Sequence, residues 1–129
     1  MDTHTYYIGM GSNVAGASAL LACARFWMCR LLGRDIRFSA PVNTEPVDFP
    51  WPALFTNQVA MVVCAKEPAA LGALLKRIER LLGRLPQHKR QGVMRIDLDI
   101  LCADGQVLRQ ADWNRPDVVE AVRSLGRCL

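Results

Sequence analysis

The distribution of apolar and polar positions predicts four strands and three helices along the chain. Short runs rich in aromatic and β-branched residues predict strands, and they fall at residues 6–10, 36–42, 57–65 and 94–102. Apolar residues recur at helical spacing from Ala17 to Leu32 on a stripe of Leu20, Ala24, Trp27 and Leu31. They recur again from Pro68 on a stripe of Leu71, Leu74, Leu75, Ile78 and Leu81. Gly33 and Gly83 are expected to end these two helices, and a weaker helical pattern covers residues 116–125.

The order of these elements, βαββαβ, predicts an α+β ferredoxin-like fold made of one domain over residues 1–129. In that plan both helices cover one face of an antiparallel sheet and leave the other face for a site. Pro41 places the second strand at an edge, and Asp104-Gly105 predicts a tight hairpin turn after the fourth strand. Residues 43–52 have no periodicity and carry three prolines, which predicts a long connection of the kind that often has a function.

Composition indicates the class of protein but does not identify its binding partners. The apolar fraction of 51% and the charged fraction of 22% are typical of a soluble globular domain. A net charge of +4 favours anionic partners but does not distinguish a nucleotide from a nucleic acid. The five cysteines form no CxxC pair, so we expect buried free thiols in the cytoplasm. The N-terminus lacks the basic start of a signal peptide, and Arg25 and Arg30 interrupt the apolar segment 17–32, so no membrane span is expected.

The candidate chemistry lies in the fourth strand, where alternation places Arg95, Asp97 and Asp99 on one face. The opposite, core-facing set is Met94, Ile96, Leu98 and Ile100. Two carboxylates roughly 7 Å apart along a strand suit Mg²⁺, which takes one or two carboxylates and fills its shell with water and substrate phosphates. Alone, such a pair is more often a solvated face. The basic loop just before it, with Arg84, His88, Lys89 and Arg90, favours a polyphosphate site.

Four motifs in order resemble the 6-hydroxymethyl-7,8-dihydropterin pyrophosphokinase family. Residues 90–100, RQGVMRIDLDI, resemble the family signature in which a basic residue, Gly-Pro-Arg and Asp-Leu-Asp follow one another. Residues 8–13 resemble its opening strand and Gly-Ser-Asn turn, and Glu79 with Gly83-Arg84 resembles the end of its second helix. Thr44-Glu45-Pro46 and Phe55-Thr56-Asn57 resemble its Thr-Pro turn and aromatic-x-Asn pair.

The resemblance implies transfer of the two terminal phosphates of ATP to the hydroxymethyl group of the pterin, leaving AMP, in folate synthesis. It implies that Asp97 and Asp99 hold two Mg²⁺ ions and that Arg84 and Arg95 are catalytic. It implies pterin contacts from Thr44, Phe55 and Asn57, and nucleotide contacts from Glu79, Arg84, Arg90, Ile100 and Arg123. The partners would be these small molecules, without nucleic acid or membrane, and the protein would be a monomer.

The chain departs from the family pattern at several positions, which keeps alternatives open. Gly92-Val93-Met94 replaces Gly-Pro-Arg, Gln91 stands where tryptophan is frequent, Asp117-Val118 replaces His-Tyr after Pro116, and Leu125 replaces an aromatic residue. The first hypothesis is an active enzyme, and the second is a relative that binds nucleotide or pterin with little turnover. An RNA-binding ferredoxin-like module is a third, but it needs exposed aromatic residues on the sheet, where acids would repel RNA.

Overall fold

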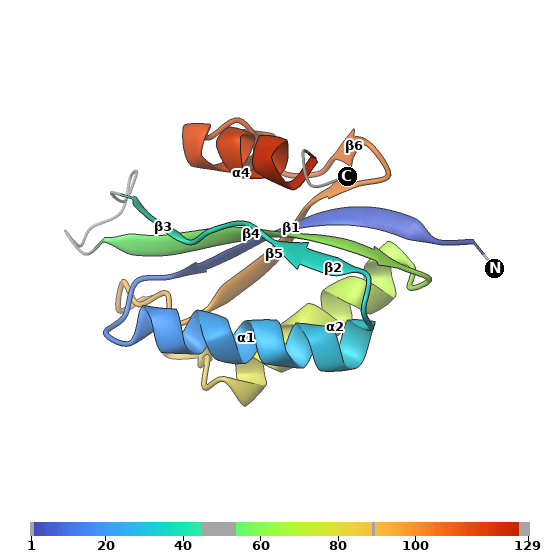
Figure 1. The fold of residues 1–129 in the computed structure, drawn as a ribbon. Coiled ribbons are helices and arrows are strands. Elements are labelled where there is room, and N and C mark those ends of the chain that lie inside the picture. Colours follow the sequence, from blue (N-terminus) through green and yellow to red (C-terminus); the bar gives the residue numbers. More distant parts are fainter. Residues whose placement is uncertain (1, 45–53, 89, 127–129) are drawn as a thin grey trace.

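The computed structural model describes residues 2–44, 54–88 and 90–126, and it contains one six-stranded sheet with helices on both faces (Figure 1). The central strand β1 (His4–Ser12) lies between β4 (Phe55–Cys64) and β5 (Asp97–Ala103), and both pairings are antiparallel. The remaining strands are β2 (Ile36–Phe38) and β3 (Val42–Thr44), which pair with β4, and β6 (Gln106–Val107), which pairs with β5. The ferredoxin-like order of elements is therefore confirmed.

Helices α1 (Ala17–Leu32) and α2 (Pro68–Leu81) lie side by side on one face of the sheet, as the sequence predicts (Figure 1). The other face is not left open, because α4 (Pro116–Gly126) lies across it. A 3₁₀ turn at Pro86–His88 lies in the segment expected to be a basic loop. The short helix α3 (Gln110–Trp113), which the periodicity missed, lies between the predicted hairpin turn and the predicted last helix. Among the described residues, no helix is both long and apolar enough to cross a membrane.

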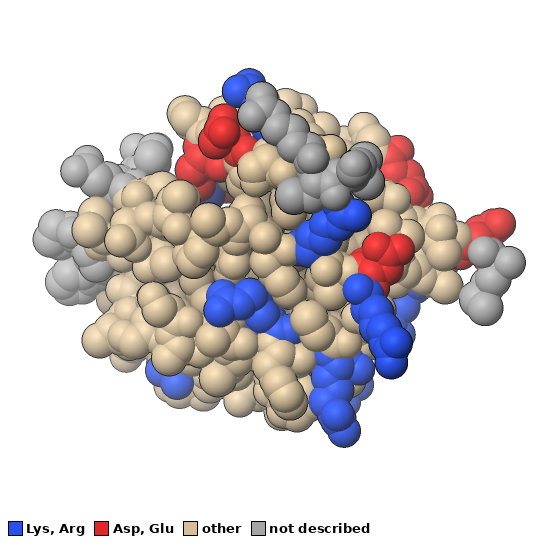
Figure 2. Space-filling model, in the orientation of Figure 1, with Lys and Arg blue, Asp and Glu red and all other residues tan. Residues whose placement is uncertain are grey.

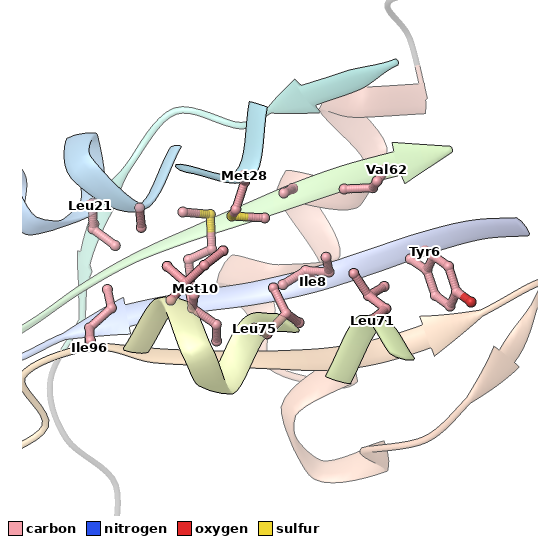
Figure 3. Close-up of a cluster of buried hydrophobic side chains, with 13 residues drawn as sticks. Tyr6, Ile8, Met10, Leu21, Met28, Val62, Leu71, Leu75 and Ile96 are labelled. Atoms are coloured by element: carbon pink, nitrogen blue, oxygen red, sulfur yellow. The ribbon is translucent and has the colours of Figure 1, made fainter. Parts of the chain in front are cut away.

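Each face of the sheet has its own hydrophobic core. The larger core joins the sheet to α1 and α2, and Figure 3 shows side chains such as Ile8, Met28 and Leu75 pointing toward one another within it. The smaller core joins β4 and β5 to α4 through Val59, Leu101, Val118 and Leu125. The site therefore occupies only the part of the second face that α4 leaves uncovered.

The predicted helical stripes are correct in α2 and displaced in α1. Leu71, Leu75 and Ile78 are buried, although Leu81 is exposed. In α1 the buried residues are Ala17, Leu21, Ala24 and Met28, and Leu31 is exposed. The displacement arises because α1 is apolar on most sides, so periodicity alone does not identify which side packs against the sheet.

Two predicted strands differ from those in the structure. The second one is divided into β2 and β3 by residues 39–41, because Pro41 cannot continue the ladder and Ser39 turns to bond Val59. The fourth begins at Asp97 instead of Met94, and Arg95 lies in a bend. Within β5 an extra residue, Leu101, interrupts the register with β1. Ile100 and Leu101 still alternate between the larger and the smaller core, but Ala103 packs on the larger core, where strict alternation would not place it.

The four cysteines that the structure describes are free thiols, and only one of these four is buried. Cys102 is buried and Cys64 half-buried, whereas Cys23 and Cys29 are exposed on α1. Cys128 lies outside the described residues. The expectation of buried cysteines is therefore wrong for the two on α1, for the same reason that its buried stripe was displaced.

Candidate functional site

A cavity of about 740 Å³ opens on the face of the sheet shared with α4, and its floor is made of glycine. Gly9 and Gly11 lie in β1 on this face, so the backbone there has no side chains above it. A Cβ atom added to Gly11 would lie 2.8 Å from Oδ1 of Asn57, and one added to Gly9 would lie 3.1 Å from the Leu101 side chain. The two glycines thus leave space between the side chains of β4 and those of β5.

One wall of the cavity comes from β3 and β4. Asn57 pairs with Gly11 across the ladder and is 7% exposed, and its Nδ2 donates a hydrogen bond to Oγ1 of Thr44. Phe55 lies two residues before Asn57, so both belong to the same face of β4, and it also lines the cavity. The three residues implied to contact the pterin are therefore neighbours, as one flat ring would require.

The opposite wall carries the two carboxylates of β5. Asp99 pairs with Gly9 and Asp97 with Gly11, so both acids stand beside the glycine floor. Burial, together with the hydrogen bond and charge of Asp99, raises the pKa of Asp97 to about 7. Burial opposes ionisation of Asp99 as well, but the hydrogen bond from Asp97 and the charges of Lys76 and Arg109 lower its pKa. Without a metal, burial and mutual repulsion therefore oppose ionisation of both carboxylates together.

Three cations surround the acid pair. Nη1 of Arg84 lies 3.0 Å from Oδ1 of Asp97. Nζ of Lys76 lies 3.4 Å from Oδ1 of Asp99, and Nη1 of Arg109 lies 3.8 Å from the same oxygen. Of these cations, only Arg109 lines the cavity. The acids are therefore partly neutralised by the protein itself.

Glu79 is buried beneath this wall and closes the free edge of β5. Its Oε2 accepts a hydrogen bond of 2.7 Å from the backbone N–H of Leu98, and its carboxylate pairs with Lys76 at 3.1 Å and Arg84 at 2.9 Å. Lys76 donates to the carbonyl of Leu98, and Arg84 to that of Ile96. These side chains satisfy the part of the β5 edge that β6 does not pair, which fixes the direction of the acids.

The rim of the cavity is a chain of alternating charges on α3 and the start of α4. Nε of Arg109 donates to Asp112 at 2.9 Å, and Nη1 of Arg115 lies 3.3 Å from the same carboxylate. Arg115 also holds both oxygens of Asp117, at 3.2 and 3.1 Å. Asp117, which departs from the family pattern, is thus paired with Arg115. Its negative charge is largely compensated within the protein.

The donor set fits a magnesium ion only with help from a substrate. Among the described residues, no group of three or more His, Cys, Asp or Glu side chains is arranged to hold a metal. Asp97 and Asp99 supply two carboxylates next to an open cavity. Mg²⁺ is normally bound by one or two carboxylates together with water and phosphate oxygens. The residues therefore fit a substrate-linked ion better than a permanently bound one.

Several residues singled out in the sequence lie away from the cavity. Arg95 does not share the face of the acids, because Nε donates at 2.6 Å to the carbonyl of Leu82, just after α2. Met94 lines the cavity in its place, so the alternation expected across these two residues is reversed. Ile100 packs on the larger core, Arg123 pairs with Glu120 on an exposed part of α4, and Arg90 is exposed.

Sequence reasoning missed Lys76, Arg109, Arg115 and the role of Gly9. The first three belong to segments whose pattern shows only solvated charge. The approach of Lys76 and Arg109 to Asp99, and of Arg115 to the rim, depends on how α2, α3 and α4 pack. A signal existed for the glycines, since Gly9 and Gly11 alternate in β1 and so share one face.

Comparison with known proteins gives consistent matches. The family described as 7,8-dihydro-6-hydroxymethylpterin-pyrophosphokinase matches residues 7–125. A protein named 2-amino-4-hydroxy-6-hydroxymethyldihydropteridine pyrophosphokinase from Porphyromonas gingivalis is 34% identical over 74% of this chain and 66% of its own length. Proteins of the same name from Methylorubrum extorquens and Pseudomonas putida are 32% and 31% identical, covering 77% and 81% of this chain. The match spans 63% of the former and 86% of the latter.

Proposed function

We propose that this chain, which belongs to the 7,8-dihydro-6-hydroxymethylpterin-pyrophosphokinase family, transfers the two terminal phosphates of ATP as one unit to the hydroxymethyl group of 6-hydroxymethyl-7,8-dihydropterin and releases AMP. This step belongs to folate synthesis, and both substrates are small molecules. The observation that carries the proposal is that one cavity contains an aromatic and amide wall and, across a glycine floor, a pair of carboxylates. The aromatic and amide wall suits a flat heterocycle, and the carboxylate wall suits a metal-bound polyphosphate.

The pterin wall supplies binding and orientation. Phe55 offers an aromatic face on which a pterin ring gains stacking energy. The Asn57 side chain can donate to and accept from the ring edge, and its hydrogen bond to Thr44 holds it in place. Because Gly11 allows the ring to approach the sheet closely, the hydroxymethyl group can point toward the acid wall.

The acid wall supplies charge. Asp97 and Asp99 would hold Mg²⁺, which would stabilise the negative charge that develops on the transferred phosphates. Arg84 contacts Asp97 and is therefore the better placed of the two arginines assigned a catalytic role, because Arg95 is directed to the end of α2. The remaining nucleotide contacts assigned to Glu79, Arg90, Ile100 and Arg123 would require the bound nucleotide to reach beyond the cavity.

A second candidate function is binding without turnover. Two features favour it: Met94 lines the cavity where the family pattern has an arginine, and Asp117 stands where it has a histidine. Each lost transition-state contact is worth on the order of 10²-fold in rate. The RNA-binding alternative gains no support, because Asp97 and Asp99 line the uncovered part of the sheet face. On the side of the molecule seen in Figure 2, much of the surface around the basic side chains is uncharged.

Product analysis tests the proposal. ATP, Mg²⁺ and 6-hydroxymethyl-7,8-dihydropterin should yield AMP by chromatography, because the attack is at the β-phosphorus. The variant Asp97→Asn should lower the rate on the order of 10²-fold. Asp35→Asn makes the same change at an exposed position after α1 and should leave the rate unaltered. ADP as the main product would exclude pyrophosphoryl transfer, and pterin binding without any AMP would support the second candidate.

A further inference from the structure

Asp99 already has two cationic partners in the absence of any ligand. Lys76 reaches its Oδ1 from α2 at 3.4 Å, and Arg109 reaches the same oxygen from the other side, just before α3, at 3.8 Å. A divalent cation that binds this carboxylate must compete with both. Their other contacts indicate which of the two side chains leaves Asp99 when a divalent cation binds.

The contacts of Lys76 tie it to the protein. Its ammonium group also donates to the carbonyl of Leu98 and pairs with the buried carboxylate of Glu79. These partners remain in place whether or not Asp99 binds a cation. These contacts therefore hold Lys76 at the edge of β5.

Arg109 is attached differently. Its side chain is 51% exposed and lines the cavity, and its shortest contact is the 2.9 Å hydrogen bond from Nε to Asp112 on the rim. That bond holds the base of the guanidinium group, while Nη1 makes, among the described residues, the longer contact with Asp99. Once a divalent cation binds the Asp99 carboxylate, Nη1 of Arg109 faces the cavity in which, under the proposed function, the phosphates of the nucleotide bind.

We propose that Arg109 is an internal counter-ion that leaves Asp99 when a divalent cation binds there and moves onto the phosphates of the nucleotide, pivoting on Asp112. The inference rests on the proposed function and adds a residue and a coupling to it. Metal and triphosphate then bind cooperatively, because the metal releases the arginine that the phosphates need. In the absence of nucleotide, Arg109 lowers the affinity of Asp99 for the metal, because the two cations compete for one carboxylate.

The test is a comparison of Arg109→Met with the wild type in three titrations at one pH. Manganese stands in for magnesium so that free ion can be counted by electron paramagnetic resonance. With manganese alone the variant should bind about two- to five-fold more tightly, since a partly exposed competing ion pair is removed. With the methylene analogue of ATP and saturating manganese it should bind about tenfold more weakly, since a charge-assisted hydrogen bond is lost. With the analogue and a chelator the change should stay under about twofold.

Two further variants control for charge and folding. Arg30→Met removes one positive charge from the exposed last turn of α1 and should alter none of the three affinities. Arg109→Lys keeps the charge and should retain most of the coupling. Thermal melting checks that each variant is folded, and an unfolded Arg109→Met is replaced by Arg109→Gln in the same titrations.

The outcomes separate the inference from the function on which it rests. An unchanged affinity for manganese alone, or an equal loss of analogue affinity with and without metal, would overturn the role of Arg109. The second result would mean that the arginine acts only through the general field of the site. A wild-type protein that binds no analogue at any manganese concentration would refute the proposed function, and the transfer of Arg109 with it.

Discussion

Replacing Glu79 separates a structural role from a nucleotide-binding one. Its side chain is 3% exposed, and its carboxylate accepts from the N–H of Leu98, a residue with no exposed surface. Glu79→Ala leaves that buried donor unsatisfied, which costs about 1–3 kcal/mol. It also removes the anion that Lys76 and Arg84 share. Because those cations are 45% and 30% exposed and keep Asp99 and Asp97 as partners, this second cost is well below the 3–5 kcal/mol of a fully buried pair.

We therefore expect Glu79→Ala to lower the free energy of unfolding by about 3 kcal/mol. Glu79→Gln keeps an oxygen for Leu98 and loses only the charge, so about 1 kcal/mol is expected. Urea denaturation of the ligand-free protein measures both values. Glu120→Ala is the matched control, since that glutamate is 68% exposed, pairs only with Arg123 among the described residues, and should cost under about 0.5 kcal/mol.

A loss below about 1 kcal/mol for Glu79→Ala would refute the edge-closing argument. If the variant were stable and yet bound an ATP analogue much more weakly, Glu79 would act on the nucleotide, as the resemblance implies. Equal losses in Glu79→Ala and Glu79→Gln would mean that charge, and not the hydrogen bond to Leu98, sets the stability of this edge.

Two further predictions concern the pterin wall and a pH-dependent contact. Asn57→Ala should weaken pterin binding by about 1–3 kcal/mol in calorimetry and leave the affinity for an ATP analogue nearly intact. Asn43→Ala on the neighbouring strand β3 should change neither affinity, and equal losses of affinity for both ligands in Asn57→Ala would make Asn57 structural. Hydrogen bonds to Asp104 and Glu67 raise the pKa of His4, so its contribution to stability is present below about pH 6.5 and is lost as the pH rises through the raised pKa. The melting temperature of His4→Gln should therefore fall below that of the wild type near about pH 5.5 and converge with it by about pH 9; a difference independent of pH would contradict this.

The periodicity of the sequence was enough to predict the order of elements and the position of the acid pair. The order of the main strands and helices follows from local patterns, and α2 begins and ends where Pro68 and the segment before Gly83 indicate. Asp97 and Asp99 share a face because alternation is a property of any strand. These features depend on neighbours within a few residues.

Alternation failed where the strand did not extend. Because β5 begins at Asp97, Met94 and Arg95 take their directions from the preceding bend, and Arg95 bonds the carbonyl that α2 leaves free after its last turn. The bulge at Leu101 likewise reverses the faces of the residues that follow. No local sequence pattern predicts the bend before β5 or the bulge at Leu101, because both depend on the neighbouring strand β1 and on the packing of α2.

The sequence by itself determined the main strands and helices, their order, and the carboxylates and glycines that line one face of the sheet. Only the tertiary structure decided that α4 covers part of that face, that Glu79 closes the edge of β5, and that Lys76 and Arg109 meet at Asp99. Local propensities act over a turn or a strand, whereas Arg109 lies ten residues beyond Asp99 along the chain and the bend after β6 returns it to the same carboxylate. The charge balance of the site is therefore a consequence of packing.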